Sequence, residues 1–195
     1  GQGDARERLS QLRALLADRP AAWGLGVVLA GSWLIAASSW VTVPMHPVPM
    51  TLQTFAILFV AGLAGARLAA ASVITWLAQA AIGLPLLADG AGGLDPFSGP
   101  TAGYLAGFVI AAFACGWFTD MPRLRGWFAM TLVFLAGHVF ILGSGWLRLS
   151  WLIGPEAAWT SGIEPFLIGA ILKSALAVVT VKLTERWVRR VATTD

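Results

Sequence analysis

Lys173 is the residue of this chain that most strongly indicates a chemical role. It is the only charged side chain in the apolar stretch 165–179. Placing a charged side chain in the middle of a membrane costs about 3 kcal/mol or more, so an intramembrane lysine usually marks a functional site. Gly169 and Ala177 lie one helical turn to either side and form a ridge of small residues, which favours packing against other helices. We therefore expect Lys173 to point into a helix bundle and to meet an anionic ligand or a carboxylate there.

A second group of polar side chains follows the proline-rich segment 43–50. Pro44, Pro47 and Pro49 stiffen this segment and remove backbone donors. Thr51 and Gln53 come directly after it. Helix capping would explain the threonine, but the amide of Gln53 needs several hydrogen-bond partners, which favours a binding role.

A long glycine-rich connection, residues 83–104, is the third candidate element. It contains Asp89, Gly92 and Gly93, and it remains apolar where an ordinary linker would be polar. Such a loop can fold over a ligand and move. Tyr104, the only tyrosine, is expected to be either an interfacial anchor or a pocket wall. The chain has no Gly-Lys-Ser/Thr sequence, which excludes a Walker A phosphate loop.

The remaining reactive side chains give weaker signals. His138 is expected to be a hydrogen-bonded structural residue, because a proton relay would need further titratable groups nearby. Cys115 lies between small residues and is expected to pack in the interior. These residues form no metal-ligand cluster, so we predict neither a metal site nor catalytic residues. Trp76 falls in the middle of an apolar stretch, where packing and pocket lining both remain open.

Composition places the chain in a membrane. Of its 195 residues, 57% are hydrophobic and 12% are charged, whereas soluble domains carry about 25% charged residues. The net charge of +3 comes without the basic and aromatic pattern of a nucleic-acid surface, so no nucleic-acid partner is expected.

The apolar stretches predict an all-α integral membrane protein, a six-transmembrane-helix bundle with long outer loops. A membrane span needs about 20 apolar residues. We place a membrane domain over residues 21–190, preceded by an amphipathic N-terminal segment, residues 1–20. The expected spans are 21–42, 51–65, 67–87, 101–119, 126–147 and 163–187.

Charge predicts the orientation of these spans. All but two of the 13 basic residues fall at one side of the predicted bundle, the exceptions being Arg148 and Lys173. Basic residues accumulate on the cytoplasmic side of membrane proteins. We therefore expect a multi-pass protein of the cell inner (plasma) membrane with both termini in the cytoplasm.

Several segments together resemble a known family. They are Val-Pro-Met-Thr-Leu-Gln-Thr at 48–54, Gly-Leu-Pro at 83–85, Gly-Gly-Leu at 92–94, Gly-Pro-Thr-Ala-Gly-Tyr-Leu-Ala-Gly-Phe at 99–108, and Pro-Phe-Leu at 165–167 followed by Gly169 and Lys173. In this order they resemble the BioY family, the biotin-specific S-components of energy-coupling-factor (ECF) transporters. The resemblance covers about residues 25–185.

The resemblance implies a six-helix S-component that captures biotin from outside the cell. It implies a transmembrane coupling (T) protein and two ATP-binding-cassette ATPase subunits as partners, with biotin as transported ligand and no cofactor. The site residues that it implies are Thr51, Gln53, Asp89, Gly92, Gly93, Tyr104 and Lys173. The family often has Asp where this chain has Ala170, so one polar ligand contact is missing or is supplied elsewhere. Whether Lys173 receives the carboxylate or a ureido oxygen of biotin stays open.

Three other functions remain as alternatives. An S-component for another small vitamin would use the same loop and lysine. A membrane enzyme of lipid or prenyl chemistry would need clustered carboxylates or a nucleophile with its base; no such set appears, so we do not expect an enzyme. A non-catalytic scaffold subunit would only pack against other proteins.

Overall fold

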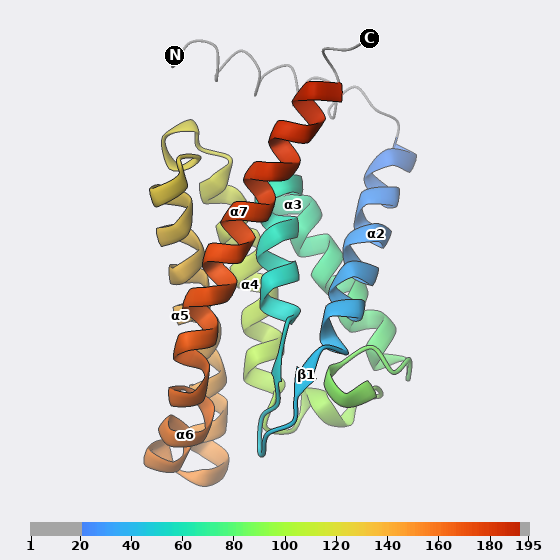
Figure 1. Ribbon diagram of the computed structural model, residues 1–195. Helices are drawn as coiled ribbons and strands as arrows, with labels where there is room; N and C mark the ends of the chain where they lie inside the picture. Colours follow the sequence, from blue (N-terminus) through green and yellow to red (C-terminus); the bar gives the residue numbers. More distant parts are fainter. Residues whose placement is uncertain (1–20, 192–195) are drawn as a thin grey trace.

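The structure, a computed structural model, describes residues 21–191 as a bundle of long helices (Figure 1). The predicted amphipathic segment 1–20 lies outside these residues. The helices and strands, in chain order, are α2 Ala21–Ser39, β1 Thr42–Val43, β2 Met50–Thr51, α3 Gln53–Ala81, η1 Ala88–Gly90, η2 Asp95–Phe97, α4 Ala102–Thr119, η3 Pro122–Leu124, α5 Trp127–Ile153, α6 Pro155–Gly162, η4 Glu164–Phe166 and α7 Leu167–Val191.

The membrane character predicted from composition agrees with this architecture. Within residues 21–191, five helices are long and apolar enough to cross a membrane, so the predicted count of six is not confirmed. The difference arises at α3, which covers two of the expected spans, 51–65 and 67–87. The chain is also not purely helical, because β1 and β2 form a small antiparallel hairpin with Thr42 opposite Thr51.

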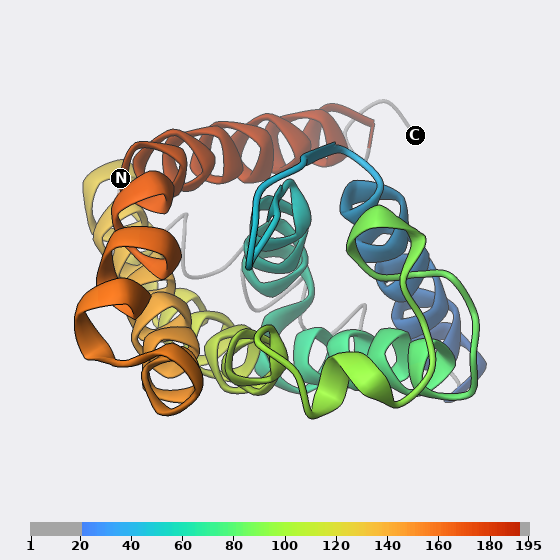
Figure 2. The same ribbon diagram turned by 90° about the horizontal axis from the view of Figure 1, so that it is seen from below.

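Helix α3 consists of two arms that meet at Gly65. This residue has φ 79° and ψ 177°, a backbone conformation outside the helical region and one that is essentially restricted to glycine. Figure 1 shows the chain reversing direction there, and the arms of residues 53–64 and 66–81 diverge from this point. Figure 2 shows the first arm near the middle of the bundle with the other helices around it.

Small residues on α4 pack closely against α5. A Cβ placed on Gly107 would lie 3.3 Å from Cα of Ile141, and one on Gly103 would lie 3.1 Å from Cα of Gly145. Contacts this short require a residue without a side chain, which is the usual way for membrane helices to approach one another.

The connection after α5 also differs from the prediction. Residues 148–162 were expected to be a loop, but α5 continues to Ile153 and is followed by α6. Gly154, with φ 89°, separates the two helices. The segment is helical because its backbone groups satisfy one another, as they must close to a membrane.

A cluster of charged residues joins the helices at the basic end of the bundle. Arg125 forms an ion pair with Glu185 and donates hydrogen bonds to the carbonyl oxygens of Gly62 and Thr119, each at 3.0 Å. Lys182 lies 3.3 Å from the carboxylate of Glu185. The cluster thus ties α3, α4 and α7 to the connection between η3 and α5, at the end of the bundle opposite the hairpin.

Replacing Gly65 with Ala should destabilise the fold. A side chain at φ 79° is strained, and its Cβ would lie 3.0 Å from a carboxylate oxygen of Asp120. We expect the free energy of unfolding to fall by about 1–2 kcal/mol, measured by denaturant titration of the purified protein in detergent.

Gly143→Ala is the matched control for this change. A Cβ at Gly143, within α5, meets nothing within 4 Å, and alanine is favoured over glycine in a helix by about 1 kcal/mol. Equal stability of the two variants would contradict the role given to Gly65.

Candidate functional site

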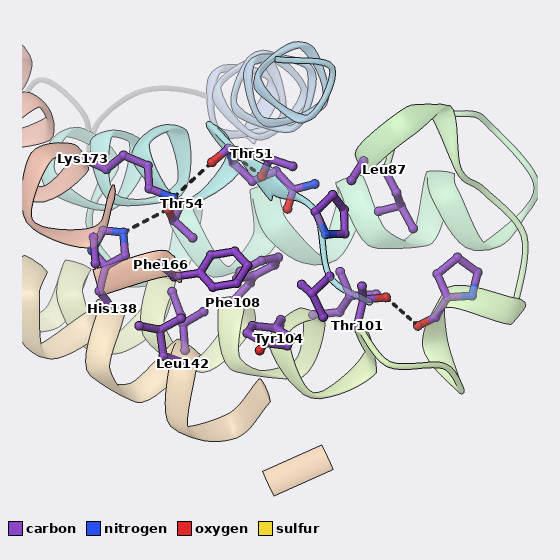
Figure 3. A pocket seen from close by; sticks show the side chains of 18 of the residues that line it. Thr51, Thr54, Leu87, Thr101, Tyr104, Phe108, His138, Leu142, Phe166 and Lys173 are labelled. Atoms are coloured by element: carbon purple, nitrogen blue, oxygen red, sulfur yellow. Dashed lines mark hydrogen bonds between the residues drawn. The ribbon is translucent and has the colours of Figure 1, made fainter. Parts of the chain in front are cut away.

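A cavity of about 300 Å³ lies within the bundle at the end that carries the hairpin. Small-molecule sites generally measure about 300–1,000 Å³ and are mostly apolar. Figure 3 shows side chains from α3, α4, α5 and α7 converging on it. The lining residues are Val48, Pro49, Thr51, Gln53, Thr54, Leu87, Ala88, Asp89, Ala91, Pro96, Thr101, Tyr104, Leu105, Phe108, His138, Ile141, Leu142, Phe166, Ala170 and Lys173.

Lys173 forms a polar end of this cavity. Its side chain is half-buried, and its Nζ donates a hydrogen bond to the backbone carbonyl of Thr51 at 3.1 Å. Within residues 21–191, no carboxylate lies within ion-pair distance of it. The ammonium therefore has one backbone partner and retains two N–H groups for further acceptors.

His138 lies close to this polar end. Its Nε2 is 2.9 Å from Oγ1 of Thr54, and its Nδ1 is 2.9 Å from Oγ of Ser174 and 3.2 Å from the carbonyl oxygen of Phe134. The ring is only 3% exposed. The predicted hydrogen-bonded histidine is thus present, and it joins α3, α5 and α7 beside the cavity.

Aromatic side chains form a wall of the cavity. The rings of Tyr104 and Phe166 lie 6.3 Å apart at an angle of 37°, and Phe108 lies beside them (Figure 3). The hydroxyl of Tyr104 donates to the carbonyl oxygen of Gly162 at 2.7 Å. Tyr104 is buried, so of its two expected roles the structure supports the pocket wall.

Trp76 lies behind this wall and does not line the cavity. Its ring is fully buried, packs 6.0 Å from the ring of Phe108 and donates from Nε1 to the carbonyl of Leu86 at 2.8 Å. Of the two roles left open for Trp76, packing is the one observed.

Two outer segments cover the cavity. The hairpin contributes Val48, Pro49 and Thr51, and the connection between α3 and α4 contributes residues such as Leu87 and Asp89. Figure 2 shows both segments at this end of the bundle. Hydrogen bonds join them: Thr42 donates to Oδ1 of Asp89 at 3.0 Å, and Trp40 donates to the carbonyl of Pro85 at 2.9 Å.

The structure brings most of the predicted site residues together. Of the seven, those that line the cavity are Thr51, Gln53, Asp89, Tyr104 and Lys173. Gly92 and Gly93 are not part of the lining. The amide of Gly93 donates to the carbonyl of Ala80 at 2.7 Å, and a Cβ on Gly92 would collide with the carbonyl of Leu84. These two glycines therefore serve the packing of the loop itself.

Sequence reasoning missed other residues of the lining. Thr54 was not assigned to a site and His138 was expected to be structural, although both lie in apolar helices where polar side chains are costly. Phe108 and Phe166 carried no signal of their own, because the sequence contains ten phenylalanines and most such residues only pack.

Comparison with known proteins points to one family. A family model described as the BioY family matches residues 13–190. A protein named biotin transporter BioY from Thermotoga maritima is 31% identical over 146 residues, which is 75% of this chain and 86% of the relative. A probable biotin transporter BioY from Pyrococcus horikoshii is 32% identical over 146 residues, again 75% of this chain and 86% of the relative.

A solved structure has the same fold. It is the crystal structure of the S-component for biotin from an ECF-type ABC transporter, with a TM-score of 0.78 and 29% sequence identity. The match covers 85% of this chain and 92% of that chain.

Replacing Tyr104 with Phe should test whether its hydroxyl serves the fold. The change leaves the ring in place but removes the buried bond to Gly162. A carbonyl at a helix end needs such a partner, so we expect the free energy of unfolding to fall by about 1–2 kcal/mol. Denaturant titration of the purified protein measures it.

Thr131→Val is the control, because the Thr131 hydroxyl bonds to Trp127 at an exposed position. Unchanged stability of Tyr104→Phe would contradict the assignment.

Proposed function

The chain belongs to the BioY family, and we infer that it is the substrate-binding S-component of a biotin transporter of the ECF type. It is a transporter component and not an enzyme. Biotin is its transported ligand, and no cofactor is involved.

The observation that carries this proposal is the Lys173 ammonium in a mostly apolar cavity. Biotin combines a bicyclic ring system, a polar ureido group, an aliphatic tail and a carboxylate. The wall of Tyr104, Phe108 and Phe166 suits the ring system and the tail. Lys173 suits an oxygen of the ligand, since among the described residues its ammonium makes a hydrogen bond to the Thr51 carbonyl and has N–H groups left for a ligand acceptor.

The protein crosses the membrane several times. We propose that it lies in the inner (plasma) membrane of the cell, crosses it six times and has both termini in the cytoplasm. The two arms of α3 support the number, because Gly65 reverses the chain between them. Within residues 21–191, most basic residues lie toward the end of the bundle opposite the cavity, as the positive-inside rule requires of a cytoplasmic face. The cavity then opens toward the outside.

The transport cycle of an ECF-type transporter needs partner subunits. We propose a transmembrane coupling protein and two ATP-binding-cassette ATPase subunits. The absence of a Walker A sequence from this chain supports this division of labour, since ATP must then be hydrolysed by other subunits.

Replacing Lys173 with Met should weaken biotin binding without unfolding the bundle. Methionine keeps most of the side-chain volume but removes the charged donor. We expect the dissociation constant for biotin to rise about 10- to 100-fold, measured by equilibrium binding of radiolabelled biotin to the purified protein.

Arg67→Met is the matched control, because Arg67 is exposed and lies outside the cavity. Unchanged binding in Lys173→Met would remove the lysine from the site. Competition by other vitamins, tested on the unaltered protein, separates a biotin transporter from an S-component of different specificity. A protein that binds none of them would be a scaffold.

Cysteine labelling should reveal the proposed orientation. Cys115, the only native cysteine, is buried and provides an unreactive background. In intact spheroplasts, we expect a membrane-impermeant maleimide to label Thr160→Cys but not Arg123→Cys, whose labelling should require lysis. The reverse pattern would contradict a cytoplasmic location of the basic end.

A further inference from the structure

Thr54 is one of the polar residues of the cavity to which the proposed function assigns no role. It lies in the first turn of α3, is 8% exposed and lines the cavity. Figure 3 shows it at the same end as Lys173 and His138. Its hydroxyl has one proton to donate and lone pairs to accept with. If the Thr54 hydroxyl donates its proton to His138, its lone pairs remain for the ligand; if it accepts from His138, its proton remains for the ligand.

The surroundings of His138 fix this direction. Lys173 lines the same cavity, and a second positive charge beside it would be unfavourable, so the imidazole is neutral. One ring nitrogen then carries hydrogen and the other a lone pair. The carbonyl oxygen of Phe134, 3.2 Å from Nδ1, can only accept. The hydroxyl of Ser174, 2.9 Å from the same nitrogen, can donate or accept and is compatible with either tautomer. A lone pair on Nδ1 would face the lone pairs of the Phe134 oxygen, so we place the hydrogen on Nδ1.

The tautomer of His138 also fixes the hydrogen bond that its other ring nitrogen, Nε2, forms with Thr54. Because Nε2 carries the lone pair, the Thr54 hydroxyl donates its hydrogen to Nε2 over 2.9 Å. The lone pairs of Thr54 Oγ1 are then left for the cavity. Ala170, which lines the same cavity, has no polar side-chain atom to compete for this role.

The two polar groups of Thr51 at this end of the cavity already have partners. The hydroxyl of Thr51 accepts a hydrogen bond from the backbone N–H of Gln53 at 3.2 Å. The carbonyl of Thr51 accepts from Lys173. Thr54 is therefore an acceptor that lies beside the strongest donor of the cavity.

On the basis of the proposed function, we propose that Thr54 accepts a hydrogen bond from a ureido N–H of biotin, with His138 as the positioning residue that holds Thr54 in its accepting state. A ureido group presents an N–H next to a carbonyl oxygen. It thus matches Thr54 as acceptor and Lys173 as donor, with the oxygen directed to the lysine. A carboxylate has only acceptor oxygens at neutral pH and would oppose the lone pairs of Thr54.

Variants of Thr54 combined with altered ligands test this assignment. Thr54→Val keeps the shape but removes the hydroxyl, and Thr54→Ser keeps the hydroxyl. The ligands are biotin and two lactam analogues, in each of which one ureido N–H is replaced by CH₂. We expect Thr54→Val to bind biotin about tenfold more weakly, and Thr54→Ser to bind within about threefold of the unaltered protein.

The analogues should identify the N–H concerned. One of them should bind the unaltered protein about tenfold more weakly than biotin but lose little more in Thr54→Val, since contacting groups are not additive. Unchanged biotin binding by Thr54→Val would overturn the proposal, as would analogue losses that multiply fully with the mutation. Should Thr54→Val fail to fold, Thr54→Ser with both analogues and the histidine measurement below still decide the matter.

The tautomer of His138 gives a readout that a purely structural role would not require. Nitrogen chemical shifts of ¹⁵N-histidine should show a protonated Nδ1 and an unprotonated Nε2. His138→Gln can place an accepting oxygen near Thr54 and should retain biotin binding better than His138→Leu. A protonated Nε2 would overturn the proposal. If the unaltered protein binds no biotin, the proposed function itself fails. If the unaltered protein binds biotin normally and the Thr54 variants bind it equally well, only the assignment of Thr54 is overturned.

Discussion

The cost of holding the Lys173 ammonium away from water is the constraint on which the site depends. A cation at this depth must find acceptors inside the protein. The carbonyl of Thr51 provides one, and it is available because the hairpin ends there, before α3 begins. The hydrogen bond from Lys173 on α7 to Thr51 therefore connects the charge of the cavity to the hairpin and to the start of α3.

The polar and aromatic parts of the cavity are connected through the helices that carry them. His138 joins α5 to Thr54 of α3 and to Ser174 of α7. Tyr104 joins α4 to the end of α6 through Gly162. The cavity walls are thus braced by hydrogen bonds that do not point into the cavity, so the shape of the site is largely preformed.

The membrane bundle and its lysine were predictable because hydropathy and charge are local properties of the sequence. Five of the seven site residues that the family resemblance implies line the cavity. The roles of Thr54 and His138 were not predictable, since their hydrogen bonds join residues 84 positions apart. The helical form of residues 148–162 was missed because polar and proline-containing segments resemble loops until their packing is known.

The reversal at Gly65 has a consequence for how the protein is made. Only Gly65 separates the two arms of α3, so no loop lies between them that could stay in water while the second arm follows the first. Unpaired backbone groups are not tolerated in lipid. With the six crossings proposed above, residues 53–81 would enter the bilayer as one pair of helices rather than as two independent segments.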